Sequence, residues 1–371
     1  MHHTAPYRRT ATFVAVALAL VMGVAACAPP NPGPTGLYLG VQANIHPVIT
    51  PESQPVTWGS APVIDANYGG ILYAGTAKEQ PDPRPAALAN GDEPLRLWVA
   101  DPHNGVANRP AIIWLHGGGF AVGIDSMYGL ATKSGAEYAQ RGYVGFSVEY
   151  RTDTTVIGQG TDTKSLCQWV QDNVDLNSQL WQDRKAQCMR NIIAAQRDTL
   201  ASVRWVRQHA AEHGVDPTKI AVGGFSAGAV TASNVAYQHD DVGTVSYFPG
   251  DNRSVAASKV QASFGASGCT YSPDLGVPTT IGAGDSPVSF IHSEFDAAVP
   301  YSCIANTVKA ARAQGLVAEL HSYCGQNLHA EKLYAAHKTD TDEQWTTFLA
   351  RELGIYSGMR PPSTDPVCQG F

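Results

Sequence analysis

Short apolar runs alternate along most of the chain with segments that have helical periodicity. Seven runs of six to nine residues are predicted to be strands, at 95–100, 111–117, 143–151, 220–226, 260–268, 287–293 and 317–324. Most of these runs are apolar on both sides of the strand alternation, so both faces of each strand are expected to be buried.

Two of the intervening segments are predicted helices that end at a glycine, residues 191–213 before Gly214 and residues 300–314 before Gly315. Strands that alternate with helices are typical of crossover connections, which join parallel strands. We therefore expect an α/β fold with a mixed, largely parallel central sheet that helices cover on both faces.

The first residues have the pattern of an export signal. Arg8 and Arg9 precede an apolar run at 11–26 that is too short for a comfortable membrane span and ends in small residues. Residues 1–26 are therefore predicted to be a signal peptide. The arginine pair also fits twin-arginine export, although two basic residues are the usual start of any signal.

The apolar run ends in VAAC at 24–27, which resembles the lipobox of bacterial lipoproteins. The resemblance implies that Cys27 becomes the acylated first residue of an exported, membrane-anchored protein. The alternative is an ordinary A-x-A cleavage site at 26–28, which would leave the protein secreted. Residues 27–36, rich in Pro and Gly, are predicted to be a tether.

The composition fits one large domain over residues 37–371. The chain has 371 residues, of which 44% are hydrophobic, which is enough to bury a large core. Its net charge of −7 is spread along the sequence without a basic run, so binding to nucleic acid or to an anionic membrane surface is not expected. Residues 37–90 contain many prolines, and only one or two edge strands near 70–75 are expected there.

The cysteines also fit an exported protein. Six remain after Cys27, namely Cys167, Cys188, Cys269, Cys303, Cys324 and Cys368. An even number in an oxidising compartment predicts up to three disulfides. If Cys167 pairs with Cys188, the others allow three connectivities, of which Cys269–Cys303 with Cys324–Cys368 is slightly favoured. The sequence has no C-x-x-C spacing, so neither a thiol redox site nor a zinc site made of these cysteines is expected.

A candidate nucleophile lies in GGFSAG at 223–228. Ser226 stands where the apolar strand 220–226 runs directly into an Ala-rich helical segment, with Gly224 and Gly228 on either side. Flanking glycines permit a tight turn, and the following helix presents its positive N-terminus beneath the serine. The alternative is a structural serine in a strand-to-helix turn.

Three consecutive glycines in HGGGF, at 116–120, follow another predicted strand. Such glycines free several backbone N–H groups to point at one developing oxyanion. With these motifs, the chain from about residue 70 to 355 resembles the α/β-hydrolase esterases, particularly the carboxylesterase and hormone-sensitive-lipase-like groups with an HGGG motif. The run at 204–229 resembles that group's approach to the nucleophile almost continuously.

The resemblance implies a role for each matching residue. Ser226 corresponds to the nucleophile, and the N–H groups of Gly118, Gly119 and Ala227 correspond to the oxyanion hole. His116 is implied to support the glycine loop and not to act as the base. The family order of nucleophile, acid and histidine places the acid after a later strand.

Asp296 matches the acid position, because it lies in the loop that follows the strand 287–293. Asp285 and Glu294 are the rivals. Asp285 precedes the strand, where the inactive edge of the sheet is expected, and Glu294 follows the strand too soon.

His329 is the candidate base, because it lies in the loop after the strand 317–324 and before another helix. His321 falls inside that strand and His337 inside the later helix. In this assignment His329 takes the proton of Ser226, and the acid orients the imidazole.

One segment departs from the family pattern. About 38 residues within 152–190 intervene before the next helix and contain Cys167 and Cys188. We expect these two to pair and to close a polar loop, which carries Trp169 and Trp181, over the site. The alternative is a surface loop that is remote from the substrate.

The sequence predicts a secreted or lipid-anchored carboxylic ester hydrolase that acts on a small-molecule ester through an acyl-enzyme. No metal or organic cofactor is needed for this chemistry. The alternatives are a peptidase or amidase with the same triad and a non-catalytic binding protein on the same fold. Short acyl esters are the default substrates, because no long apolar lid is present, and the oligomeric state is not indicated.

Overall fold

The computed structural model describes residues 38–51, 63–64, 80–81, 97–121, 129–150, 152, 156–157, 164–237, 257–271, 281–356, 362 and 368. All statements on structure below refer to these residues. The predicted signal peptide, Cys27, the tether and the strand expected near 70–75 lie outside them.

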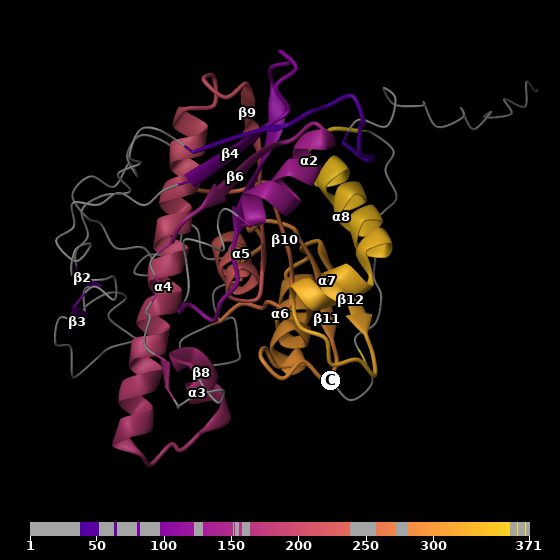
Figure 1. Cartoon of the computed structure of the whole chain (residues 1–371). Helices are drawn as coiled ribbons and strands as arrows, with labels where there is room; N and C mark the ends of the chain where they lie inside the picture. Colours follow the sequence, from indigo (N-terminus) through magenta and orange to yellow (C-terminus); the bar gives the residue numbers. More distant parts are fainter. Residues whose placement is uncertain are drawn as a thin grey trace, which may run out of the picture. The chain divides into compact units, whose positions relative to one another are not determined.

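An eight-stranded sheet forms the centre of the fold (Figure 1). Its strands in spatial order are β1 (Val48–Pro51), β4 (Leu97–Asp101), β6 (Val144–Val148), β5 (Arg109–Leu115), β9 (Val215–Phe225), β10 (Ala262–Ala266), β11 (Val288–Ser293) and β12 (Ala318–Tyr323). The β1–β4 and β4–β6 pairs are antiparallel, and the other five pairs are parallel. All seven predicted strands are present, and the predicted mixed, mostly parallel sheet is confirmed. The sequence analysis does not predict β1.

Two further sheets have two strands each, and they pair β2 (Val63–Ile64) with β3 (Gln80–Pro81), and β7 (Val156–Ile157) with β8 (Lys164–Ser165). The described helices are a π-helical turn at Ala131–Gly135, α2 (Ala136–Gln140), α3 (Leu166–Asp172), α4 (Gln179–Gln208), α5 (Ala227–Tyr237), α6 (Tyr301–Ala313), α7 (Glu331–Ala336) and α8 (Lys338–Glu352). None of them is long and apolar enough to cross a bilayer. Pro34–Phe371 forms one compact unit.

Helix α4 differs from the helix predicted at 191–213. It starts 12 residues earlier, at Gln179, because Ser178 accepts a hydrogen bond from the backbone N–H of Trp181 at 3.3 Å and caps the first turn. It ends at Gln208, since His209 has left the helical conformation. The expected loop at 152–190 is therefore largely helical in its described part.

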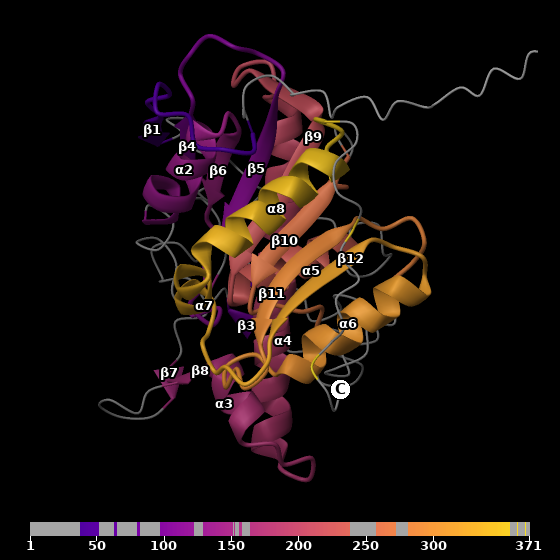
Figure 2. The ribbon, with the colours of Figure 1, turned by 90° about the vertical axis from the view of Figure 1, so that its right-hand side faces the viewer.

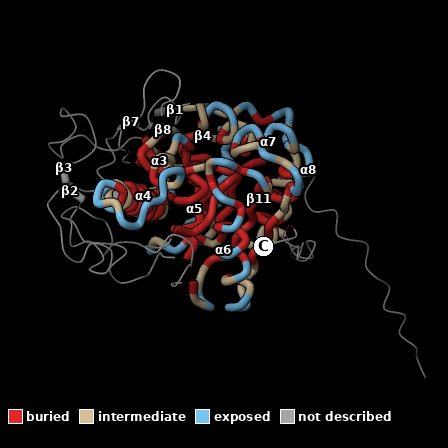
Figure 3. Tube along the Cα trace, turned by 90° about the horizontal axis from the view of Figure 1, so that it is seen from below, coloured by how far each residue is buried: buried red, intermediate tan, exposed pale blue. Residues whose placement is uncertain are grey.

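Helices cover both faces of the sheet, and β5 shows how its sequence divides between them. Ile113 and Leu115 belong to a core cluster that residues of α3, α4, α5 and α6 complete. Ile112 and Trp114 point the other way, into a cluster with residues of α2, α7 and α8. Successive side chains of a strand face opposite sides, so a continuous apolar run buries both faces. Figure 2 shows α8 crossing the second face, and Figure 3 shows the buried interior between the helical layers.

The strand order creates a crevice at the carboxyl ends of β5 and β9. After β5 the chain passes to β6 on one side, whereas after β9 it passes to β10 on the other side. Parallel sheets bind ligands where the connections diverge in this way. The glycine motif at 116–120 follows β5 and Ser226 follows β9, so both candidate motifs lie at this point.

Three disulfides join Cys167 to Cys188, Cys269 to Cys303 and Cys324 to Cys368. These are the pairs that the sequence analysis favours. The first ties α3 to α4, and the second ties the segment after β10 to α6.

Candidate active site

Ser226 occupies the turn between β9 and α5 with a backbone φ of +53°. A non-glycine residue rarely adopts this conformation, which costs on the order of 1–3 kcal/mol. Two hydrogen bonds hold it in place: the Ser226 N–H donates to the carbonyl of Ala266 at 3.0 Å, and the Ser226 carbonyl accepts from the N–H of Val230 at 2.9 Å. The turn exposes part of the serine above the sheet.

The glycines on either side of Ser226 are required by close backbone packing. A β-carbon at Gly228 would lie 2.2 Å from the carbonyl oxygen of Leu115, and one at Gly224 would lie 2.6 Å from the backbone of Gly228. Real β-carbons do not approach so closely. The strained turn therefore depends on β5, β9 and α5 meeting without side chains between them.

The structure brings together the three residues that the sequence analysis selects. His329 Nε2 lies 2.8 Å from Ser226 Oγ. His329 Nδ1 lies 2.9 and 2.8 Å from the two carboxylate oxygens of Asp296. A neutral imidazole can therefore donate from Nδ1 to the carboxylate and accept the serine hydroxyl proton at Nε2.

Asp296 is held as a buried carboxylate, with its side chain fully shielded from solvent. It accepts hydrogen bonds from the backbone N–H groups of Ala298 and Val299 at 2.9 and 3.0 Å. Burial is the largest single influence and would raise the pKa of Asp296, but the hydrogen bond and charge of His329, a hydrogen bond from Ser267 and the charge of His292 together lower that pKa below its ordinary value. The acid is therefore kept ionised.

Two further residues support this pair and were missed by sequence reasoning. Ser267 follows β10 directly, has a φ of +56°, and accepts a hydrogen bond from the N–H of Ala330 at 2.8 Å. Its side chain also hydrogen-bonds Asp296 and helps to lower the pKa of that acid. His292 is buried, and its Nε2 lies 2.9 Å from the Val299 carbonyl. The only signal for Ser267 in the sequence is its place at the carboxyl end of a strand.

The rival residues have partners elsewhere. Asp285 accepts a hydrogen bond from the N–H of Gly282 at 2.7 Å, at the other end of β11. His321 lies within β12, as expected. His337 follows α7 and stacks on Tyr323 with ring centroids 3.8 Å apart.

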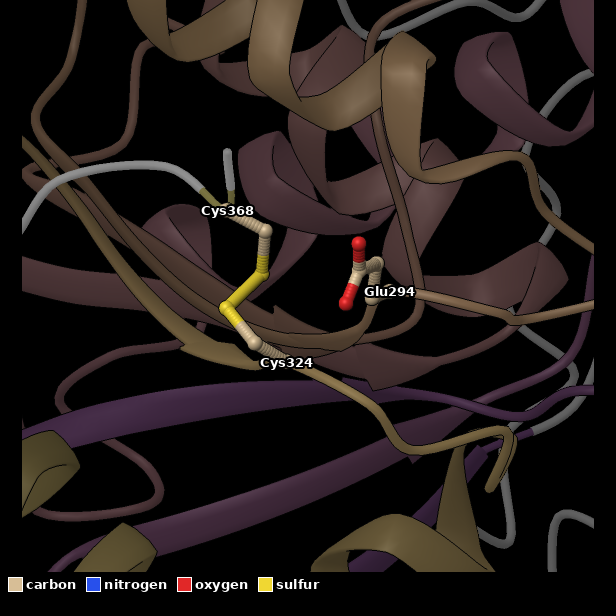
Figure 4. Close-up of side chains that lie close together, drawn as sticks. All are labelled: Glu294, Cys324 and Cys368. Carbon is tan, nitrogen blue, oxygen red and sulfur yellow. A yellow bond between two sulfur atoms is a disulfide. The ribbon is translucent and has the colours of Figure 1, made fainter. Parts of the chain in front are cut away.

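Glu294, the other rival acid, accepts a hydrogen bond from the N–H of Gly325 at 2.7 Å. It lies beside the Cys324–Cys368 disulfide, and the three side chains form a cluster of potential metal ligands (Figure 4). Thiolates bind metals, and both sulfurs here are committed to a disulfide. This cluster therefore does not offer the ligand set of a metal site.

The glycine loop lies directly against the serine. A β-carbon on Gly117 would be 3.3 Å from Cβ of Ser226. Gly118 and Gly119 have φ values of +108° and +61°, which only glycine adopts without strain. Ala227 is the first residue of α5, so its N–H has no partner within the helix. Backbone donors from the loop and from the helix N-terminus thus flank one hydroxyl.

His116 packs behind the loop, as the sequence analysis expects. Its ring is buried and stacks on Tyr150 with centroids 4.1 Å apart, and its Nδ1 donates to the carbonyl of Gly117 at 2.8 Å. Burial lowers the pKa of His116 to about 4, so the ring is neutral at neutral pH. Its role is to support the loop.

A small pocket opens beside Ser226. Besides Ser226 and Gly119, its lining includes Cys167 and Cys188, so the bridged insertion forms part of the wall. The expected tryptophans do not line it among the described residues. Trp181 is buried in the core, where its Nε1 donates to the carbonyl of Val170 at 2.9 Å.

Comparison with known proteins supports this fold. The BD-FAE family matches residues 97–179 and 183–274. These ranges include the glycine loop and Ser226, and they end before Asp296 and His329.

Two curated relatives match the chain over less than half of its length. Phenmedipham hydrolase of Pseudarthrobacter oxydans is 26% identical over 168 residues, which is 43% of this chain and 27% of that protein. Gut esterase 1 of Caenorhabditis briggsae is 25% identical over 155 residues, 41% of this chain and 23% of that protein. The matched part of the chain thus corresponds to about a quarter of the length of each relative.

Solved structures match over more of the chain. Esterase 2 of Thermogutta terrifontis, solved phosphorylated by paraoxon, is 22% identical with a TM-score of 0.52, over 72% of this chain and 91% of the other. The same esterase with propionate bound gives a TM-score of 0.52 over 73% of this chain and 92% of the other. At this identity the likeness shows the fold alone. The chain has the α/β-hydrolase fold.

Proposed function

We propose that the chain is a carboxylic ester hydrolase in which Ser226, His329 and Asp296 act as a catalytic triad. One observation carries the proposal: the ring of His329 bridges Ser226 Oγ and the Asp296 carboxylate, at 2.8 Å on each side. The esterases among the relatives favour an ester bond over a peptide bond as the bond that is cleaved.

The geometry supports a two-step mechanism. Ser226 Oγ attacks the ester carbonyl carbon while its proton passes to His329 Nε2, and the resulting imidazolium is stabilised by the ionised Asp296. The imidazolium then protonates the departing alcohol, which leaves the acyl group on Ser226. Water then attacks the acyl-enzyme while His329 takes its proton, and the imidazolium returns that proton to Ser226 Oγ as the bond to the acyl carbon breaks and the carboxylic acid is released.

The negative oxygen of each tetrahedral intermediate is stabilised by backbone donors. The N–H groups of Gly118, Gly119 and Ala227 are proposed as the oxyanion hole, because they flank Ser226. Gly118 and Gly119 have positive φ angles, which glycine adopts without strain. Donors that are fixed in advance need no rearrangement during the reaction, and one such donor contributes about 2.7–4 kcal/mol.

The location of the protein is also a proposal. The apolar run at 11–26 and the VAAC sequence that ends it support export with lipid attachment at Cys27. Partition of the protein with membranes in its native host, and its release by Cys27→Ala, would test this.

Hydrolysis of p-nitrophenyl butyrate by Ser226→Ala tests the function. Loss of the nucleophile of a triad lowers turnover by about 10⁶-fold. Ser302→Ala is a matched control, because Ser302 is exposed on α6, and it should keep full turnover. A folded Ser226→Ala protein with more than a few per cent of wild-type turnover would contradict the proposal.

A further inference from the structure

The pocket beside Ser226 opens between the proposed oxyanion donors and the loop of the catalytic acid, where Ala298 and Val299 line it. Gly119 and Ala227, two of the proposed oxyanion donors, are part of its lining, whereas His329 is absent from the described residues that line it. The departing alcohol must take its proton from His329 Nε2, so the alcohol belongs on the histidine side. The group that remains for the pocket is the acyl chain of the ester.

The walls of the pocket suit an aliphatic chain. Its lining is mainly apolar, and α3, α4 and α5 contribute the apolar or weakly polar side chains of Cys167, Val170, Cys188, Ile192 and Val230. Each methylene group that such a pocket removes from water favours binding by about fourfold until the space is filled. The pocket can therefore discriminate between esters by the length of their acyl chains.

Helix α3 supplies one wall, and its start lies against the catalytic elements. Ser165, which caps α3, is so close to Gly119 that a β-carbon on that glycine would lie 2.5 Å from the serine hydroxyl. One turn later, Gln168 Nε2 donates to the carbonyl of Ala297 at 3.4 Å, next to Asp296. The helix thus spans the pocket from the oxyanion loop to the loop of the catalytic acid.

Two further contacts fix the position of α3. The Cys167–Cys188 disulfide ties it to α4, and the side-chain amide of Gln171 donates a hydrogen bond to the hydroxyl of Tyr271. Gln171 is six residues beyond Ser165, so it lies about 9 Å along the helix from the oxyanion loop. Both Gln171 and Tyr271 line the pocket.

We propose that α3 is the wall that sets the acyl-chain length this site accepts, with Gln171 as the length-limiting side chain and the Cys167–Cys188 disulfide holding the wall in place. The proposal rests on the proposed function, since it concerns the substrate of the same serine. The insertion that departs from the esterase pattern thereby acquires a role in specificity.

Two substitutions of opposite volume at one position test the proposal. Gln171→Ala removes the side chain and lengthens the pocket, whereas Gln171→Trp fills it. Gln171 is only partly buried, so both variants should fold. Gln182→Ala is the matched control, because Gln182 lies in the same insertion and is exposed, and its side chain donates a hydrogen bond to the carbonyl of Leu176, away from the pocket lining.

The measurement is kcat/KM on p-nitrophenyl esters with acyl chains from acetyl to decanoyl. Gln171→Ala should raise the octanoyl-to-butyryl ratio by at least about tenfold and Gln171→Trp should lower it by as much, because two methylenes gained or lost at about fourfold each change binding by more than about tenfold. Gln182→Ala should keep the wild-type ratio. A Cys167→Ser/Cys188→Ser variant should show a flatter length profile, and Cys324→Ser/Cys368→Ser should not.

The outcomes separate the inference from the proposed function. If the wild-type protein hydrolyses no ester of the series, the proposed function is wrong. If it hydrolyses the short esters and the ratios of Gln171→Ala and Gln171→Trp both stay at the wild-type value, ester hydrolysis stands and the length-setting role of α3 is overturned.

Discussion

The turn around Ser226 and the insertion that carries α3 form two sides of one pocket, and the chain holds them by different means. The turn is held by backbone, since glycines let β5, β9 and α5 meet at distances that no β-carbon tolerates. The wall is held by side chains, through the Cys167–Cys188 disulfide and the hydrogen bond from Gln171 to Tyr271. The catalytic groups need a backbone that is fixed in position. A wall built from side chains can instead be altered by substitution to suit another substrate.

Substitutions of the triad or of the oxyanion loop should strongly lower turnover for every ester, whatever its acyl length. Asp296→Asn should lower turnover by about 10⁴-fold, because an amide no longer selects the tautomer of His329 that accepts the serine proton. Asp285→Asn, at the other end of β11, is the control and should be active. Equal turnover of the two variants would show that Asp296 does not orient the base.

Gly119→Ala should reduce turnover by at least about 10²-fold, since it misplaces an oxyanion donor. The new β-carbon would lie 2.5 Å from the hydroxyl of Ser165, at a φ of +61°. Gly105→Ala is a suitable control, with a similar φ of +72° and open space around it. If the Gly119→Ala enzyme is as active as Gly105→Ala, Gly119 does not supply an oxyanion donor.

Loss of the disulfide in the α3 wall should lower the free energy of unfolding more than it affects turnover. Cys167→Ser/Cys188→Ser should lose about 3 kcal/mol of unfolding free energy, as expected for a bridge across 21 residues. Its turnover of the acetyl ester should stay within about tenfold of wild type, because the triad and the loop do not depend on the bridge. Urea unfolding and initial rates measure the two quantities. If the folded double-serine variant loses as much acetyl-ester turnover as Asp296→Asn, the α3 wall is as necessary for catalysis as the turn around Ser226, and the contrast between them is wrong.

A further effect on stability, which appears only at acidic pH, concerns the support of the glycine loop. Burial lowers the pKa of His116 to about 4, below the value of about 6.5 for an unfolded chain. Between these values the unfolded chain binds a proton that the folded chain does not. The free energy of unfolding should therefore fall by up to about 3 kcal/mol as the pH drops from about 6.5 to about 4.

His116→Asn should remove that part of the pH dependence and keep a donor near the carbonyl of Gly117. His103→Asn is the control, because His103 is exposed. Urea unfolding at pH 7 and pH 4.5 gives the comparison. An unchanged pH dependence in His116→Asn would mean that the buried imidazole does not control acid stability.

The same contrast explains what could be predicted from the sequence. The strands and the sheet type are predictable, because apolar runs and glycines that the backbone requires are visible in the sequence. Asp296 and His329 are selected through the resemblance to the α/β-hydrolase esterases, whose order of nucleophile, acid and histidine they match. The extent of α4 was misjudged, since its start depends on the Ser178 cap far from the apolar face. The contacts of Ser267 and of Gln171 could not be predicted, because they join segments far apart in the chain and leave no local pattern.

Reaction with an active-site-directed phosphonate, followed by intact-mass measurement and peptide mapping, tests the central claim most directly. The account predicts one adduct per chain, on Ser226, with none formed on the Ser226→Ala variant. An adduct on another residue, or equal labelling of Ser226→Ala, would contradict the assignment of Ser226 as the nucleophile.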